Sequence, residues 1–139
     1  TDGRDTPPMS ALHYISELES KLKTLGFGQI ATISGRFWGM DRDNHWDRTQ
    51  AVYSAMVESK GQFCSSALSS ISQSYNSGKT DEFIFPTVIT DNGKPIAKVQ
   101  DGDSVVFFNF RSDRARQITL AFAAEKFQYF KRKKISNLY

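Results

Sequence analysis

The stretch Val105–Arg116, VVFFNFRSDRAR, changes abruptly from apolar to charged residues. Its unbroken apolar run, Val105–Phe108, predicts a strand buried on both faces, because a half-exposed strand would alternate. Ser112 or Asp113 can cap a following helix, predicted over Arg114–Ala124, by accepting hydrogen bonds from its free backbone N–H groups. The stretch therefore predicts a buried strand that leads directly into a helix.

Basic residues gather where the predicted elements end. Arg111 and Arg114 fall between a strand's carboxyl end and a helix's amino end, which is where open α/β sheets bind anions. Arginine suits carboxylate and phosphate because its planar fork donates two parallel hydrogen bonds. A single such arginine is more often a surface ion-pair partner, but several at loop edges indicate an anion site. The predicted site residues are Arg4, Asp5, Arg36, Arg42, Arg111 and Arg114.

The rest of the chain supplies amphipathic helices and short strands. Apolar residues recur at helical spacing from Leu12 to Leu25 before Gly26, and again after Asn44, which is predicted to cap its helix. The helical spacing also predicts a helix that starts at Phe63 and ends around Gly78. Phe37–Asp43 is expected to form an irregular loop.

Strands are predicted over Gln29–Ser34, Phe83–Ile89, Ile96–Val99 and the half-strand Ile135–Tyr139. The Asp91-Asn92-Gly93 turn predicts a hairpin. These patterns predict one α/β domain, with a mostly parallel sheet flanked by helices and an antiparallel hairpin extension.

Composition restricts the class of protein. The 139 residues are 39% hydrophobic and 13% aromatic, which is typical of a soluble globular domain. A net charge of +3 is too small to indicate a nucleic-acid partner. No apolar stretch approaches the roughly 20 residues that span a bilayer, and no signal peptide is recognisable. The single Cys64 is typical of a reducing compartment, so a cytoplasmic location is expected. Both ends of the chain look cut, which predicts a piece of a longer protein.

Several candidate residues have two interpretations. Asp5 could serve as a general base or as a helix cap, and the local pattern favours the cap. Asp41 and Asp43 could bind a metal ion, but without a histidine cluster they are expected to orient Arg42 through salt bridges. His45, like His13, has no partner at ligand spacing. Cys64, in turn, is expected to pack in the core and not to act as a nucleophile.

Four motifs together resemble cofactor-independent phosphoglycerate mutase. They are DGRDTPP, SGRFWGMDRDNHWDR, DEFIFPTVI and DGDSVVFFNFRSDRARQIT, and they span almost the whole chain in the family's order. The resemblance implies an isomerase that interconverts 3-phosphoglycerate and 2-phosphoglycerate through a phosphoserine, without 2,3-bisphosphoglycerate. It also implies two domains: a phosphatase-like one that holds two manganese ions and the nucleophilic serine, and an inserted one that grips the glycerate.

The resemblance assigns roles within this chain. Residues 1–139 would be a single partial domain, the later part of the inserted substrate-binding domain, and its partner would be the absent phosphatase-like domain. Asp5 would be catalytic, and the substrate-binding residues would be Arg4, Asp5, Arg36, Arg42, Arg111 and Arg114. The metal ligands and the serine would lie elsewhere, so no metal is expected in this piece and it should be inactive alone. The alternative is a non-catalytic anion- or RNA-binding module that uses the basic run Lys131–Lys134.

Overall fold

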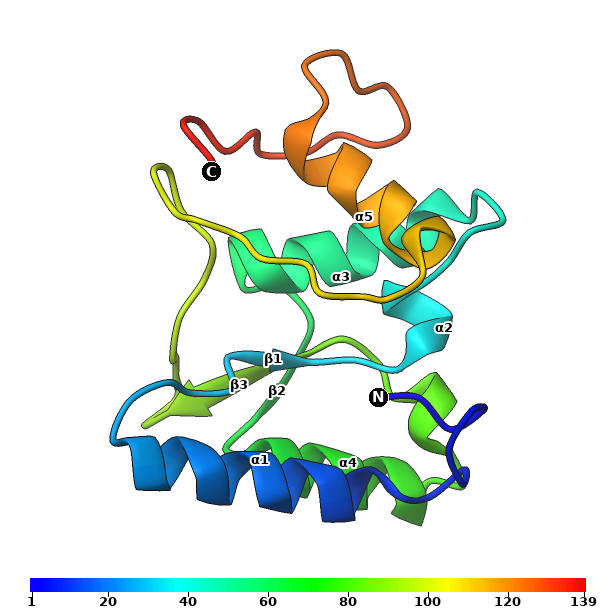
Figure 1. Cartoon of the computed structure of the whole chain (residues 1–139), viewed down its shortest axis with the longest axis vertical. Coiled ribbons are helices and arrows are strands. Elements are labelled where there is room, and N and C mark those ends of the chain that lie inside the picture. Colours follow the sequence, from blue (N-terminus) through cyan, green and yellow to red (C-terminus); the bar gives the residue numbers. More distant parts are fainter.

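The computed structural model describes all residues, Thr1–Tyr139. A small sheet lies in the middle, α1 and α4 lie side by side on one face, and α3 covers the other face with α5 stacked on it (Figure 1). The elements in chain order are α1 (Ala11–Leu25), β1 (Thr32–Ile33), α2 (Arg36–Gly39), α3 (Trp46–Glu58), β2 (Gln62–Cys64), α4 (Ala67–Asn76), the 3-10 turn η1 (Asp81–Phe83), β3 (Thr87–Asp91), β4 (Lys94–Pro95) and α5 (Ser112–Ala123).

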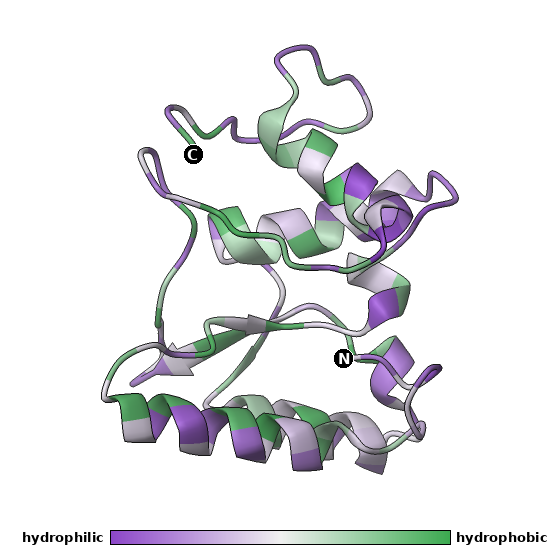
Figure 2. Ribbon diagram, in the orientation of Figure 1, coloured by the Kyte–Doolittle hydropathy of each residue, from purple (hydrophilic) through white to green (hydrophobic).

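The first core lies between the sheet and the α1–α4 pair. Hydrophobic and hydrophilic residues alternate along α1 (Figure 2), as an amphipathic helix requires. The helix ends at Gly26, whose φ of 76° is the left-handed conformation typical of a helix C-terminus. The buried residues of this core are Ala11, Ile33, Cys64, Ala67, Ile71, Ile84 and Ile89. Cys64 is free and buried, which confirms its predicted packing role.

The second core holds α5 against α3. Tyr53 of α3 is 1% exposed, and its hydroxyl donates a hydrogen bond to the Lys133 carbonyl oxygen at 2.6 Å. Phe122 of α5 packs against the Tyr53 ring, and Ile135 of the C-terminal segment joins the same cluster. This core fixes the direction of α5 and therefore the position of its N-terminal arginines.

The α/β class is confirmed, but the mostly parallel sheet is wrong. The central strand β3 pairs antiparallel with β1 and parallel with β2, and β4 adds a second antiparallel pairing. Several helices and β2 lie between β1 and β3 in the chain, and the two strands pair in opposite directions. The hairpin at Asp91–Lys94 is confirmed, with Lys94–Pro95 as its second strand in place of the predicted Ile96–Val99.

The predicted buried strand Val105–Phe108 is also wrong. These residues form an irregular segment (Figure 1), and Val106 and Phe108 are 84% and 92% exposed. The reason is geometric: no strand of the sheet lies beside this segment, whose backbone is tied instead to the chain's end, where the Val105 N–H donates to the Tyr139 carbonyl oxygen at 2.8 Å. Ile135–Tyr139 forms no strand either.

Other helix boundaries differ from the predicted ones because of local contacts. Ser66 caps α4 by accepting from the Ser69 N–H at 3.1 Å, so the helix starts at Ala67 and Phe63 falls in β2. His45, and not Asn44, is the N-cap residue of α3. Part of the predicted loop after Gly35 is the short helix α2. The helices are too short or too polar for any of them to cross a membrane.

Candidate functional site

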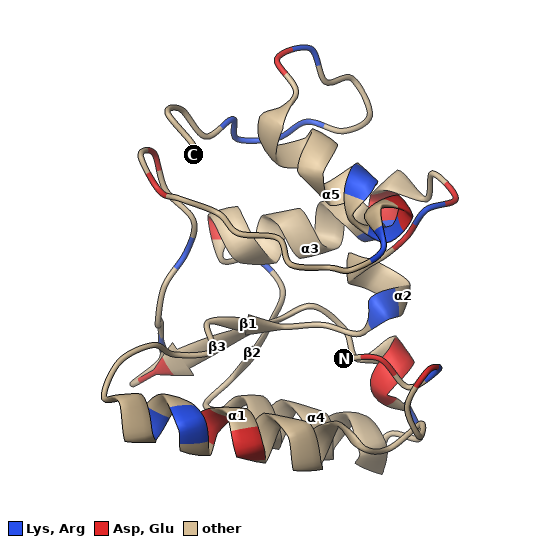
Figure 3. Cartoon of the chain, in the orientation of Figure 1, with Lys and Arg blue, Asp and Glu red and all other residues tan.

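Charged residues of both signs gather at one side of the molecule, around α2, η1 and the N-terminus of α5 (Figure 3). Thr1 reaches this side through backbone hydrogen bonds: its backbone nitrogen donates to the Ser34 carbonyl oxygen at 2.7 Å, and the Arg36 N–H donates to the Thr1 carbonyl oxygen at 2.9 Å. Gly35 lets β1 approach η1, because a Cβ there would lie 2.1 Å from the Glu82 carbonyl oxygen.

Arg36 joins two carboxylates. Its Nη1 donates to Asp2 Oδ1 at 2.6 Å and to Asp5 Oδ2 at 2.9 Å, while the Arg36 side chain is only 8% exposed. Burial disfavours the charged forms, but the hydrogen bonds outweigh it, so the pKa of Arg36 is raised and the pKa of Asp2 is lowered. Asp5 is therefore an ion-pair partner whose side chain remains 77% exposed. It does not cap a helix, so the capping interpretation of Asp5 was wrong.

Arg42 and Arg111 share a second carboxylate, that of Asp113. Arg42 Nη1 lies 2.6 Å from Asp113 Oδ2, and Arg111 Nε lies 3.6 Å from Asp113 Oδ1. The hydrogen bond from Arg42 lowers the pKa of Asp113. Neither Ser112 nor Asp113 caps α5 with its side chain. Asp113 links the two arginines instead, a role that only the three-dimensional arrangement reveals.

Arg114 lies between these groups. Its Nη1 donates to the Met40 carbonyl oxygen at 3.0 Å, but its Nε is buried without a hydrogen-bond partner. Burial lowers the pKa of Arg114, and the neighbouring charges of Arg42 and Arg36 lower it further. The charges of Arg42 and Arg36 therefore repel the Arg114 guanidinium, and an anion beside Arg114 would relieve both this repulsion and the unpaired N–H.

Arg4 stands apart from the other predicted residues. Its Nη1 lies 3.3 Å from Glu82 Oε1, and the side chain is 63% exposed. The structure thus places Arg36 and Arg42 within electrostatic reach of Arg114. Asp5 joins this group through its ion pair with Arg36, and Arg111 joins it through Asp113, whereas Arg4 pairs with Glu82 outside it. Sequence reasoning missed Asp2, whose closeness to Arg36 depends on the backbone pairing of Thr1.

Asp41 is the buried centre of the adjacent loop. Its oxygens accept hydrogen bonds from the His45 N–H at 2.9 Å, His45 Nδ1 at 3.0 Å, Arg48 at 3.3 Å and Gln117 Nε2 at 3.0 Å. Desolvation opposes ionisation, yet these hydrogen bonds lower the pKa of Asp41. Asp41 does not orient Arg42 through a salt bridge, so that prediction was wrong.

Manganese does not fit this loop. Ligand atoms of Asp41, Asp43 and His45 lie within 4.8 Å of one another. However, both Asp41 oxygens already accept protein hydrogen bonds, and Arg48 contacts the same carboxylate. A cation would have to displace those donors and sit beside a fixed positive charge, which disfavours binding. We therefore assign no metal to these residues.

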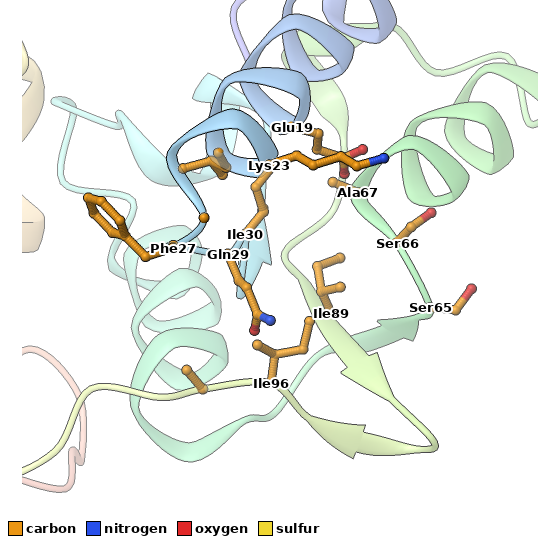
Figure 4. A pocket seen from close by; sticks show the side chains of 14 residues that line it. Glu19, Lys23, Phe27, Gln29, Ile30, Ser65, Ser66, Ala67, Ile89 and Ile96 are labelled. Atoms are coloured by element: carbon orange, nitrogen blue, oxygen red, sulfur yellow. The ribbon is translucent and has the colours of Figure 1, made fainter.

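A hollow lies elsewhere on the molecule. It has a volume of about 740 Å³ and opens beside the C-terminal end of α1, where Ile30, Ile89 and Ile96 line it (Figure 4). Lys23 is its only basic lining residue, and none of the six predicted site residues reaches it. This hollow lacks the converging donors that an anionic ligand needs, so the arginine cluster is the stronger candidate site.

The comparisons with known proteins show which family the chain belongs to. The family described as the N-terminus of BPG-independent PGAM matches residues 1–139. The chain belongs to this family. The 2,3-bisphosphoglycerate-independent phosphoglycerate mutase of Clostridium acetobutylicum is 53% identical over 135 residues, which cover 97% of this chain and 26% of that protein. The corresponding protein of Clostridioides difficile is 49% identical over 139 residues, 27% of its length.

The fold of this family member also matches a solved structure. A crystal structure of Leishmania mexicana phosphoglycerate mutase at low cobalt concentration superposes with a TM-score of 0.90 at 32% identity, covering 99% of this chain and 27% of that one. The chain thus spans about a quarter of the length of the relatives that it matches. The likeness to mutases does not favour the alternative of an RNA-binding module.

The basic run Lys131–Lys134 gives no support to that alternative either. Arg132 donates to the carbonyl oxygens of Ala121 and Ala124 at the end of α5, and its guanidinium lies 4.6 Å from the centre of the Phe127 ring. Arg132, which is partly buried, is thus bound to the C-terminal end of α5. A run whose arginine packs against the protein itself does not offer a continuous basic surface to nucleic acid.

Proposed function

We propose that this chain is the glycerate-holding part of a 2,3-bisphosphoglycerate-independent phosphoglycerate mutase, which interconverts 3-phosphoglycerate and 2-phosphoglycerate. The observation that carries the proposal is the buried, unpaired Nε of Arg114 beside the guanidinium groups of Arg36 and Arg42. Such a cluster is complementary to a small, multiply charged anion. The chain would form part of an inserted substrate-binding domain, and the phosphoryl-transferring domain would be the partner outside these residues.

The proposed division of labour has a physical basis. The arginines bind the glycerate while its phosphoryl group is held by a nucleophile outside this chain, so the glycerate can reorient without escaping. Its return is then effectively unimolecular, and effective molarities for such steps can reach about 10⁵ M. Asp5, exposed on one side and held by Arg36 on the other, exchanges a proton with the glycerate hydroxyl groups.

Metal and location belong to the same proposal. Two manganese ions would be bound by residues outside this chain, since the Asp41 loop does not fit a cation. A cytoplasmic location is supported by Cys64, which is free in the folded chain as a reducing compartment permits.

The test compares two arginines of α5 in the full-length protein. Arg114→Ala removes the unpaired donor, and we expect it to lower kcat/KM for 3-phosphoglycerate by about 100-fold, as for a lost charged hydrogen bond. Arg116→Ala removes the same charge from an exposed position two residues further on and should leave kcat/KM unchanged. Equal activity of the two variants would contradict the proposal.

A further inference from the structure

Gln117 lies one helical turn after Arg114 on α5 and is 5% exposed. Both polar atoms of its side-chain amide are hydrogen-bonded: Nε2 donates to Asp41 Oδ2 and to Thr49 Oγ1, both at 3.0 Å, and Oε1 accepts from the Asn44 N–H at 2.9 Å. The amide orientation follows from these partners, because a backbone N–H can only donate and a carboxylate accepts. One buried side chain therefore connects α5 to α3 and to both sides of Arg42.

The loop that carries Arg42 is closed around Asp41. The Asp41 carboxylate, 2% exposed, accepts from the backbone N–H groups of Asp43 at 3.2 Å and His45 at 2.9 Å. Gln117 completes this set from α5. The backbone after Arg42 is thereby tied to the buried carboxylate of the residue before it, while the Arg42 side chain points outward to Asp113.

The Arg42 side chain itself makes few contacts that would fix its position. It is 42% exposed and its ion-pair partner Asp113 is itself 39% exposed, so this pair alone orders the loop weakly. Arg114 contacts the Met40 carbonyl oxygen, just before Asp41 in the chain. The same face of α5 thus presents one arginine and clamps the backbone that presents the other.

We infer that Gln117 is a positioning residue that sets the spacing between Arg42 and Arg114. This inference rests on the proposed function, because the spacing matters only if the two guanidinium groups bind one anion. Preordering the loop lowers the conformational entropy that anion binding would otherwise cost. Without the clamp, the Arg42 loop must order itself each time an anion binds.

The test is a double-mutant cycle in the full-length enzyme with 3-phosphoglycerate as substrate. Gln117→Met keeps the length of the side chain but removes its three hydrogen bonds, and Arg42→Ala removes the positioned group. We expect Gln117→Met to lower kcat/KM about tenfold, mainly through KM. The double variant should be within about twofold of Arg42→Ala, because a clamp has no effect once the clamped group is gone.

The unfolding midpoint is measured for all members of the cycle. Losses of kcat/KM that multiply in the double variant, or an unchanged kcat/KM in Gln117→Met, would overturn the inference. An Arg42→Ala variant with normal kcat/KM would instead contradict the proposed function. Gln117→Asn, one methylene too short to reach Asn44 and Asp41 together, repeats the cycle if Gln117→Met does not fold. Thr119→Val, on the exposed side of α5, is the matched control.

Discussion

The carboxylate of Asp5 accepts a hydrogen bond from Arg36 Nη1 at 2.9 Å, although the two residues are 31 positions apart in the chain. This pair joins the N-terminal loop to the first turn of α2 and holds one oxygen of Asp5 while the side chain stays 77% exposed. The local sequence pattern predicted that Asp5 caps a helix. The ion pair instead leaves it available to a ligand bound by the arginines.

Replacing Asp5 by Asn should separate proton transfer from binding. The amide keeps the size of the side chain but is a far weaker base, so in the full-length protein we expect kcat to fall about 100-fold or more and KM to change little. Steady-state kinetics with 3-phosphoglycerate measure both. An unchanged kcat would show that Asp5 transfers no proton and serves only as the ion-pair partner of Arg36.

The positions of several arginines relative to strands and helices could be predicted from the sequence, because local residue patterns mark where those elements end and begin. Gly35-Arg36 does follow a strand, and Arg111 and Arg114 do precede or begin a helix. The predicted reason was partly wrong, since the segment before Arg111 is irregular and α5 is placed by its packing on Tyr53. The apolar run Val105–Phe108 did not predict burial correctly, since Val106 and Phe108 are 84% and 92% exposed.

Strand direction and the buried polar contacts could not be predicted. Whether β1 runs parallel or antiparallel to β3 depends on the path of the chain between them, which periodicity does not encode. The contact between Asp41 and Gln117 spans 76 positions and connects two residue types that are common on surfaces. No local pattern distinguishes them from solvated side chains.

Arg111→Lys tests the need for a planar fork. Arg111 is 62% exposed and only loosely paired with Asp113, so its loss should cost little stability. An ammonium group cannot donate two parallel hydrogen bonds, and we expect kcat/KM for 3-phosphoglycerate to fall about tenfold in the full-length protein. Arg116→Lys is the matched control. Normal kcat/KM in Arg111→Lys would show that Arg111 does not bind the substrate through two parallel hydrogen bonds.

Tyr75 gives the fold a pH dependence in the alkaline range. Burial and the hydrogen bond to Asp81 raise the pKa of Tyr75 to about 12, from 10.0 in an unperturbed tyrosine. A raised pKa favours the protonated folded state, so this stabilisation is complete below pH 10 and is lost as the pH rises through 12. The stability difference between the native chain and Tyr75→Phe should shrink over that window.

Two measurements check this prediction. Denaturant unfolding at increasing pH gives the stability difference, and tyrosinate absorbance of the folded protein should show a late transition that Tyr75→Phe lacks. A stability difference that stays constant from pH 10 to 12 would show that Tyr75 is not shielded as its raised pKa implies.

Asp81 should be the most sensitive carboxylate for stability. It is 1% exposed, and Oδ2 accepts from the Ser10 and Ala11 N–H groups at 2.9 Å, which caps α1 from a distant part of the chain. Asp81→Ala leaves these donors and the Tyr75 hydroxyl without their acceptor. The free energy of unfolding should therefore fall by about 3 kcal/mol or more, measured by urea denaturation. Asp91→Ala, at an exposed position, should change it by less than about 0.5 kcal/mol; equal losses in the two variants would mean that Asp81 does not hold the start of α1.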